Sequence, residues 1–361
     1  MVVLTTNWVW ESPFYGFVIR FIDFYNVNDG NESIINNLKP KIDEGYSVLV
    51  FPEGSRSKDQ NITRFHKGAF YLAKQLNLDI VPIIIHGAGD CMRKGENYVR
   101  SGKITLKIFD RISAPHVDFG NDYHELTKSL QTFYRTNYKL LKKDCETADY
   151  FADTLIKNYV FKGPILEWYC RIKVKLEDNY RYFNEIIPPK ADIMDIGCGY
   201  GFMSYMLGFL SNERKIFGID YDADKIEIAQ NCISKNENVK FEYADATQYK
   251  FVNKDVFILS DILHYISEEK QNMLIENCIN HLNNNGIIII RDANKNLKTR
   301  HWGTRYTEFF STKTGFNKLE GGKLHFTNVD AFINIANKFN LKYEVIDNTK
   351  LTSNILFIIQ N

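Results

Sequence analysis

The sequence predicts an α/β protein of two domains, the second of which contains a doubly wound, mostly parallel sheet. Short apolar runs alternate with segments of helical periodicity along most of the chain, which is the pattern of strands joined by helices. One such run, residues 192–196, leads directly into glycines at every second position. A separate set of apolar runs fills the first third and ends well before that turn.

The overall composition restricts the classes of function. The 361 residues suffice for two or three domains. The 45 basic and 44 acidic side chains nearly cancel, so the charge indicates neither a nucleic-acid partner nor strong attraction to an anionic membrane. The six cysteines form no C-x-x-C pair, which argues against a disulfide framework or a metal site and favours a cytoplasmic location. No apolar run approaches the ~20 residues of a membrane-spanning helix.

The first third is expected to fold as its own α/β domain over residues 1–120. Strand-like runs cover residues 46–51, 79–87 and 104–108, and an amphipathic helix is predicted over residues 66–76. The first run ends in a polar turn whose planar, permanently charged arginine suits phosphate and whose glycine lets the backbone approach a ligand. The candidate site residues of this turn are Glu53, Gly54 and Arg56.

This turn, FPEGSRS at residues 51–57, resembles motif III of the lysophospholipid and glycerol-phosphate acyltransferases. Residues 81–83 (VPI) resemble motif IV of the same family, and residues 67–70 (KGAF) resemble the helix start between the two motifs. The resemblance implies that Arg56 binds a phosphate and that Glu53 orients the acceptor or holds Arg56.

The acyltransferase resemblance is incomplete. The family's catalytic motif, a histidine and an aspartate separated by four residues, is absent from residues 1–150, and the basic residue expected near Asp23 is replaced. In that motif the histidine acts as general base on the acceptor hydroxyl. Two explanations stay open: an upstream polypeptide carries the base, or the domain has kept its fold and lost its chemistry. This chain alone is therefore expected to show no acyltransferase activity.

Residues 121–190 are expected to form a helical linker or lid between the domains. Helical spacing runs from residue 123 to residue 141, and aromatic side chains are dense from residue 150 to residue 183. These aromatics either pack the helices together or cover a cofactor and an apolar acceptor. The prolines at positions 188 and 189 end the last helix before the next strand.

Residues 191–361 combine the strand–helix pattern with carboxylates at the ends of the first three strands. The carboxyl ends of parallel strands meet at one edge of a sheet, where open α/β sheets bind ligands. The three carboxylates, Asp195, Asp220 and Asp245, are expected at that edge. The strand-like runs cover residues 192–196, 216–220, 239–243, 256–260, 287–290, 341–345 and 354–359.

The glycine triplet is one residue shorter in its second half than the dinucleotide fingerprint G-x-G-x-x-G. With an aspartate just ahead of it, it resembles motif I of the class I S-adenosylmethionine-dependent methyltransferases. The resemblance implies a Rossmann-like sheet with an antiparallel last strand and S-adenosylmethionine as cofactor. It also implies that the ribose hydroxyls bind Asp220 and that the adenine amino group lies near Asp245. The cofactor-binding residues are then Asp195, Gly197, Gly199, Gly201, Asp220, Asp245 and Ala246.

A methyl acceptor that is a weakly acidic hydroxyl or amine also needs a base. Four candidates lie near predicted carboxyl ends of strands, and His264 is preferred; its alternative role is that of a packed or capping histidine. The others are Asp261, Asp292 and His325. Aromatic side chains favour a small apolar, phenolic or acyl-bearing acceptor, and the resemblance implies that the long connection at residues 293–323 helps to build its pocket.

The order of the two domains resembles larger bacterial fusions in which an exporter-like membrane module precedes an acyltransferase and a methyltransferase. An upstream membrane module, or peripheral contact with the inner face of the membrane, is therefore an expected partner, and lipid metabolism an expected setting. The leading hypothesis is a methyltransferase with an incomplete acyltransferase domain. The alternatives are a lipid acyltransferase completed by an upstream polypeptide and a non-catalytic lipid-binding scaffold.

Overall fold

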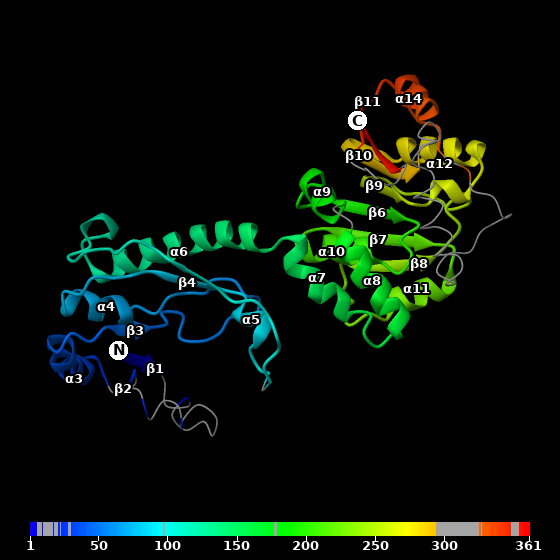
Figure 1. The fold of residues 1–361 in the computed structure, drawn as a ribbon. Helices are drawn as coiled ribbons and strands as arrows, with labels where there is room; N and C mark the ends of the chain where they lie inside the picture. Colours follow the sequence, from blue (N-terminus) through cyan, green and yellow to red (C-terminus); the bar gives the residue numbers. More distant parts are fainter. Residues whose placement is uncertain are drawn as a thin grey trace. The chain divides into compact units, whose positions relative to one another are not determined.

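The protein, described here from a computed structural model, divides into two compact units, Met1–Cys145 and Glu146–Asn361 (Figure 1). The structure describes residues 1–5, 9, 17, 21, 23–27, 30–96, 98–176, 179–293, 325, 327–347 and 354–361. The predicted insertion at residues 293–323 lies outside these ranges except for its first residue. Within these ranges, no helix is long and apolar enough to cross a membrane.

The first unit contains a parallel three-stranded sheet of order β2-β1-β3. Its strands are short: β1 (Val2–Thr5), β2 (Asp23–Asn26) and β3 (Val48–Val50). Two helices, α3 (Asn31–Asp43) and α4 (Gly68–Gln75), contribute leucine and isoleucine side chains to the apolar cluster on this sheet. The buried members of that cluster are Val2, Leu4, Ile34, Leu38 and Leu72.

A second, two-stranded sheet pairs β4 (Ile83–His86) with β5 (Thr105–Ile108) in antiparallel register. The observed strand β4 is shorter than the strand that was predicted over residues 79–87. Pro82 has no backbone N–H to donate to a neighbouring strand, and β4 begins at the residue after it. The helix α6 (Tyr123–Cys145) packs against one face of this sheet, where Ile84 is buried. The short helices α5 (Ala88–Cys91) and η1 (Val117–Phe119) complete the described part of the unit.

The second unit is built on a seven-stranded sheet of order β11-β12-β10-β9-β6-β7-β8. The strands from β6 to β10 run parallel to one another, and β12 pairs antiparallel with both β10 and β11. The predicted doubly wound sheet with an antiparallel last strand is confirmed. The strands are β6 (Asp192–Ile196), β7 (Lys215–Asp220), β8 (Val239–Tyr243), β9 (Lys254–Ser260), β10 (Leu282–Ala293), β11 (Lys342–Ile346) and β12 (Asn354–Gln360).

Helices cover both faces of this sheet, which explains why its central strands are continuously apolar. Successive residues of β9 face opposite layers: Ile258 belongs to the cluster with α7 to α11, and Leu259 to the cluster with α12 and α14. Figure 1 shows these two helical layers. The helices are α7 (Ala148–Lys157), α8 (Pro164–Leu176), α9 (Asn179–Ile186), α10 (Phe202–Leu210), α11 (Ala223–Gln230), η2 (Leu263–Tyr265), α12 (Glu268–Asn280) and α14 (Val329–Lys338).

A buried arginine joins the chain segments that precede β6 and β7. Arg214, which is 1% exposed, donates hydrogen bonds to the backbone oxygens of Ile187 at 2.7 Å, Pro188 at 3.1 Å and Leu207 at 3.2 Å. It also donates to Oδ1 of Asn184 at 2.8 Å. The guanidinium thus ties the end of α9 to α10 and to the turn before β7 by charged hydrogen bonds to buried backbone oxygens.

We expect Arg214→Ala to lower the free energy of unfolding of the second unit by about 3 kcal/mol, because several buried acceptors lose their charged donor. Denaturant titration followed by fluorescence measures this change. The control is Arg171→Ala on α8, whose side chain is half exposed and pairs only with Glu167 one turn away; it should change stability by less than about 0.5 kcal/mol. Equal losses in both variants would contradict the assigned role of Arg214.

Candidate functional site

The turn from β6 into α10 has three glycines in a left-handed backbone conformation. Gly197, Gly199 and Gly201 have φ angles of 73°, 54° and 80°, a left-handed backbone that side chains disfavour. A Cβ atom on Gly197 would lie 2.5 Å from the side chain of Ile262, and one on Gly201 would lie 2.6 Å from the ring of Phe241. Gly199 differs, because its nearest neighbour would be 3.9 Å away. The first and third glycines shape the turn, and the middle one leaves space for a ligand.

Asp220, the last residue of β7, is hydrogen-bonded to this turn. Its Oδ2 accepts the backbone N–H of Gly199 at 2.8 Å, and its Oδ1 accepts the backbone N–H of Asp222 at 2.9 Å. Burial raises the pKa of the Asp220 carboxyl, and these two amides with the nearby Lys225 act in the opposite direction. Each oxygen retains a second acceptor position, so the carboxylate is oriented and can still bind hydroxyl groups.

Asp195 lies deeper, within β6. It is 3% exposed and accepts a hydrogen bond at 2.5 Å from the hydroxyl of Ser204, in the first turn of α10. Burial raises the pKa of Asp195 to about 6. The bond joins the strand to the helix across the glycine turn, and the carboxyl group also lines the cavity beside that turn.

Asp245 lies in the turn that follows β8 and is exposed. Its Oδ1 accepts the backbone N–H and the hydroxyl of Thr247, both at 2.8 Å. Asp245 and Ala246 line the same cavity as the glycine turn. Three strand ends that are separated along the chain are therefore brought together, as the sequence predicts.

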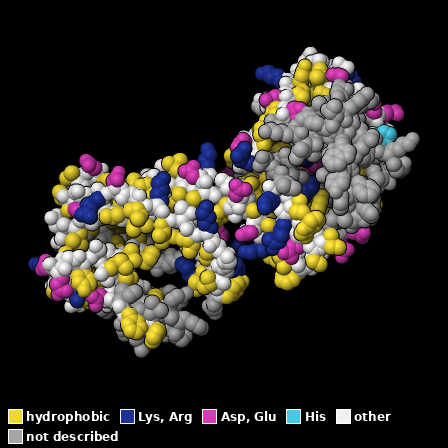
Figure 2. Space-filling view, viewed as in Figure 1, with side chains coloured by type: hydrophobic (Ala, Val, Ile, Leu, Met, Phe, Trp, Pro, Cys, Tyr) yellow, Lys and Arg dark blue, Asp and Glu magenta, His cyan; other side chains and the backbone are white. Residues whose placement is uncertain are grey.

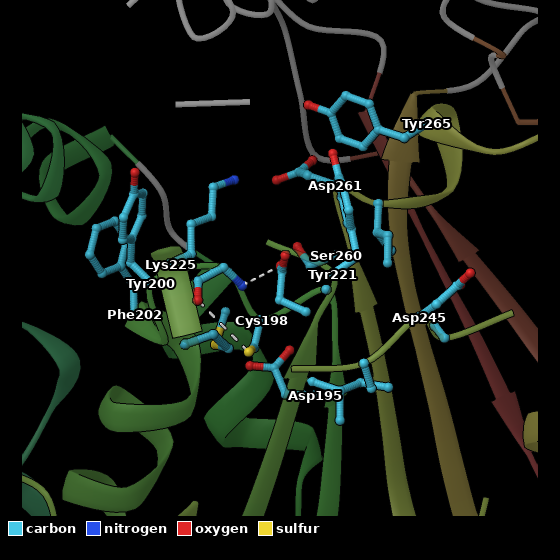
Figure 3. A pocket seen from close by; sticks show the side chains of 18 of the residues that line it. Asp195, Cys198, Tyr200, Phe202, Tyr221, Lys225, Asp245, Ser260, Asp261 and Tyr265 are labelled. Atoms are coloured by element: carbon cyan, nitrogen blue, oxygen red, sulfur yellow. Dashed lines mark hydrogen bonds between the residues drawn. The ribbon is translucent and has the colours of Figure 1, made fainter. Parts of the chain in front are cut away.

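The cavity at this edge of the sheet has a volume of about 350 Å³. Of the predicted cofactor residues, six line it and Gly201 shapes the turn behind it. In Figure 3, Lys225 extends from one side of the cavity and Asp261 from the other. Side chains of α8, α9, α11, η2 and the glycine turn that lie outside the predicted cofactor set also line the cavity. These residues include Tyr169, Lys173, Tyr180, Tyr200, Lys225 and Tyr265.

The aromatic residues of the predicted linker fall into two groups. Tyr159 and Phe183 are fully buried in the core on one face of the sheet. Tyr169 lines the cavity, and Tyr180 both belongs to that core and lines the cavity. The helices α7 to α9 thus pack into the core, and α8 and α9 also contribute side chains to the cavity wall, whereas α6 belongs to the first unit.

His264 and Asp292 are paired with each other and do not line the cavity. The His264 Nδ1 lies 2.6 Å from Asp292 Oδ1, and both side chains are buried. Asp292 Oδ2 also accepts the backbone N–H of Leu263 at 2.7 Å. His325 is exposed, and its backbone N–H donates to the backbone oxygen of His264 at 2.9 Å. This arrangement ties the loop after β9 to the end of β10, and His264 is buried there, as in the packed histidine that the sequence offered as the alternative.

Asp261 is the predicted base candidate that lines the cavity. It directly follows β9 and has a φ angle of 56°, an uncommon conformation for a residue with a side chain. Its carboxylate forms an ion pair with Arg291, accepts a hydrogen bond from Nδ2 of Asn354 at 3.0 Å and lies 3.8 Å from Nζ of Lys173. Side chains from β10, β12 and α8 therefore converge on one carboxylate at the cavity wall.

In the first unit, the predicted site residues hold the turn after β3. Glu53 Oε2 accepts the backbone N–H of Thr63 at 2.7 Å. Gly54 has a φ angle of 65°, and a Cβ on it would lie 2.9 Å from the ring of His66. Arg56 donates to the backbone oxygen of Met92 at 3.2 Å. These contacts order the turn and bring the segments after β3 and β4 together. Across the described ranges of both units, no cluster of three His, Cys, Asp or Glu side chains could hold a metal ion.

Two family models match the chain. Residues 188–332 match the model described as a methyltransferase domain, and residues 1–86 match the model described as acyltransferase. The chain therefore joins an acyltransferase-family segment to a methyltransferase domain, as the two motif resemblances indicate. Residues 188–332 are thus similar to a methyltransferase domain, and the geometry of the glycine turn and strand-end carboxylates fits S-adenosylmethionine as cofactor.

Two kinds of curated relative match separate parts of the chain. A 1-acyl-sn-glycerol-3-phosphate acyltransferase of Cocos nucifera is 36% identical over 91 residues, which is 25% of this chain and 30% of the relative. A carboxy-S-adenosyl-L-methionine synthase of Campylobacter jejuni is 24% identical over 163 residues, which is 45% of this chain and 65% of the relative. The chain thus spans less than two thirds of the length of each.

Solved structures resemble the second unit at low identity. The pyocyanin biosynthetic protein PhzM is 13% identical with a TM-score of 0.43, covering 56% of this chain and 60% of that one. The magnesium protoporphyrin IX methyltransferase of Synechocystis with bound SAH is 15% identical with a TM-score of 0.41, covering 59% of this chain and 97% of that one. At these scores neither structure informs the function.

We expect Asp195 to make stability depend on pH. Its pKa of about 6 is above the ordinary value of about 3.9, so its stabilising contribution is complete below about pH 4 and is lost as the pH rises through about 6. Asp195→Asn has no such loss. The stability of the variant relative to wild type should therefore rise by about 2 kcal/mol from pH 4 to pH 7, measured by denaturant titration. Parallel pH curves would contradict this.

Proposed function

We propose that the second unit transfers the methyl group of S-adenosylmethionine to an acceptor that enters the cavity between the glycine turn and α8. The observation that carries the proposal is the Asp220 carboxylate, which is held by two backbone amides beside the open Gly199. An oriented acceptor of this kind suits a pair of ribose hydroxyls. The exposed Asp245 lines the same cavity and is suited to an adenine amino group.

The cofactor supplies a sulfonium that is already an excellent methyl donor, so the protein mainly aligns it with the acceptor. The backbone at Gly199 lets the cofactor lie close to the turn. Asp195, behind the turn, fixes the start of α10 through Ser204. The helices α8 and α9 line the opposite side of the cavity, where they can reduce the access of water.

The acceptor is proposed to be small and at least partly aromatic, apolar or acyl-bearing. The support is the composition of the cavity wall: rings of Tyr169, Tyr180 and Tyr265 line it together with Phe202 and Met203. Aromatic rings bury apolar surface, and a tyrosine hydroxyl can also bind a polar substituent. The Campylobacter jejuni relatives are named for making a carboxylated cofactor, so product analysis should follow the cofactor as well as the acceptor.

Asp261 is the proposed group that contacts the acceptor. It reaches the cavity wall directly, whereas His264 and Asp292 pair below it. The ion pair with Arg291 and the bond from Asn354 fix the direction of its carboxylate. A carboxylate fixed in this way can orient an acceptor hydroxyl or amine and accept its proton.

For the first unit, two proposals from the sequence remain: an acyltransferase completed by an upstream polypeptide and a lipid-binding scaffold. The observation that favours the first is the ordered turn after β3, where Glu53 and Arg56 are both held by backbone contacts. An ordered turn preorganises a binding site. Membrane contact and a role in lipid metabolism belong to the same proposal.

We expect Asp220→Ala to weaken S-adenosylhomocysteine binding by about 30-fold to 100-fold, because charged hydrogen bonds to both ribose hydroxyls are lost. Isothermal titration calorimetry with the purified chain measures this. The control is Asp224→Ala, an exposed acid in the first turn of α11, which should stay within about twofold of wild type. Failure of the wild-type chain to bind would contradict the proposal and favour the scaffold.

We expect Asp261→Asn to lower methyl transfer from labelled cofactor into a cell extract by about 100-fold, with S-adenosylhomocysteine affinity unchanged. The amide of Asn has nearly the same shape as the carboxylate of Asp, but it cannot accept a proton from the acceptor at neutral pH. His264→Ala serves as the comparison and should lower the melting temperature, since it removes the buried partner of Asp292. If His264→Ala abolished transfer in a fully stable protein and Asp261→Asn did not, the base would be His264.

A further inference from the structure

Large apolar side chains are exposed at the turn between α7 and α8 and on one face of α8. Phe161, in the turn, is 85% exposed, and Ile165 and Trp168, on the helix, are 60% and 58% exposed. A spacing of three residues places Ile165 and Trp168 on the same face of a helix. Neighbouring apolar side chains that a folded protein leaves exposed commonly mark a binding surface.

Hydrogen bonds hold this turn in place. Tyr159 is fully buried, and its hydroxyl donates to the backbone oxygen of Tyr200 at 2.8 Å. Asn158 Oδ1 accepts the backbone N–H of Ser234 at 3.0 Å, which brings the turn after α11 beside the turn after α7. Ile233, in the turn after α11, is 67% exposed. Together these neighbouring segments carry an apolar patch, which consists of Phe161, Ile165, Trp168 and Ile233.

The helix α8 connects this patch with the cavity. One face of the helix, with Leu166 and Cys170, is buried in the core. A second face, with Tyr169 and Lys173, lines the cavity. The third face carries Trp168 and its neighbour one turn away in the patch. The patch and the cavity wall are therefore adjacent faces of one helix.

The chain segment that carries most of the patch is basic. Residues 154–175 contain five basic side chains and one acidic side chain, a local charge of +4, whereas the charge of the whole chain is +1. The one acid, Glu167, is paired with Arg171. Figure 2 shows hydrophobic and basic side chains together over the part of the second unit where Figure 1 draws α8. The patch is thus complementary in charge to an anionic surface. The basic residues are Lys157, Lys162, Arg171, Lys173 and Lys175.

We propose that the apolar patch docks on an anionic lipid bilayer. Phe161 and Trp168 insert at the boundary of headgroups and acyl chains, and the basic side chains of the segment lie beside the lipid phosphates. Binding of this kind combines buried apolar area with attraction to anionic lipids, and tryptophan is a preferred residue at that boundary. A fluid bilayer adapts to a protruding side chain such as Phe161, whereas a protein partner needs a matching pocket.

The docked orientation brings the cavity close to the bilayer, because α8 contributes to both the patch and the cavity wall. An acyl-bearing acceptor can then pass from the lipid to the cavity along this helix with little exposure to water. This consequence rests on the methyl transfer proposed above, whereas the docking itself does not depend on it.

The test measures cosedimentation of the full chain with phosphatidylcholine vesicles that contain either no anionic lipid or about one third phosphatidylglycerol. Binding should be about 30-fold or more tighter with the anionic lipid, and high salt should remove most of this difference. Brominated acyl chains should quench tryptophan fluorescence in the anionic vesicles. Trp168→Phe keeps an aromatic ring in the patch, so it should retain binding and lose the quenching.

Matched variants separate the patch from general apolar adhesion. Phe161→Asp should weaken binding to the anionic vesicles by about 30-fold, because it removes an inserted ring and adds a negative charge. Met273→Asp on α12, where the native side chain is 63% exposed, should stay within about twofold. Thermal melting verifies that both variants are folded, and calorimetry with S-adenosylhomocysteine tests the cofactor proposal separately.

Four outcomes would each overturn the docking proposal. They are equal binding to both kinds of vesicle, equal losses in the two aspartate variants, quenching that survives Trp168→Phe, and self-association of the chain that Phe161→Asp abolishes. The last outcome would identify the patch as an interface between copies of this chain.

Discussion

The cofactor cradle of the second unit depends on the hydrogen bond between the Gly199 amide and the Asp220 carboxylate, which is 2.8 Å long. It joins the end of β7 to the turn after β6, where the backbone oxygen of Ile219 also accepts the N–H groups of Gly197 at 2.8 Å and Cys198 at 3.0 Å. Burial raises the pKa of this carboxyl, and the amides stabilise its charged form. The bond therefore both orders the turn and keeps a charged acceptor directed toward the cavity.

The rest of the sheet provides the rigidity on which this bond depends. Alternate residues of β9 and β10 pack into opposite helical layers, so a shift in register by one residue would transfer every side chain to the wrong layer. The strand ends are consequently fixed relative to one another. The carboxylate of Asp261 can then bind both Arg291, near the end of β10, and Asn354, at the start of β12. The backbone of Asp261 has a positive φ angle, which is uncommon for residues other than glycine.

The two units use their site residues differently. In the second unit, the carboxylates at the strand ends face a cavity. In the first unit, Glu53 and Arg56 form contacts with backbone groups of neighbouring segments, and the sheet to which their turn belongs has an open edge. The second unit thus has a doubly wound sheet in its described residues, whereas the described strands of the first form two separate sheets.

The sequence by itself determined the class of both units and most strands of the larger sheet, because apolar periodicity and a glycine turn are local properties. It also placed the candidate cofactor residues at neighbouring strand ends, and six of the seven line one cavity. It did not reveal the short strands β1 and β2, whose four residues carry little periodicity. Only the tertiary structure showed that Asp261 lines the cavity and that His264 does not, because this depends on pairing with Arg291 and Asp292, which are distant in sequence.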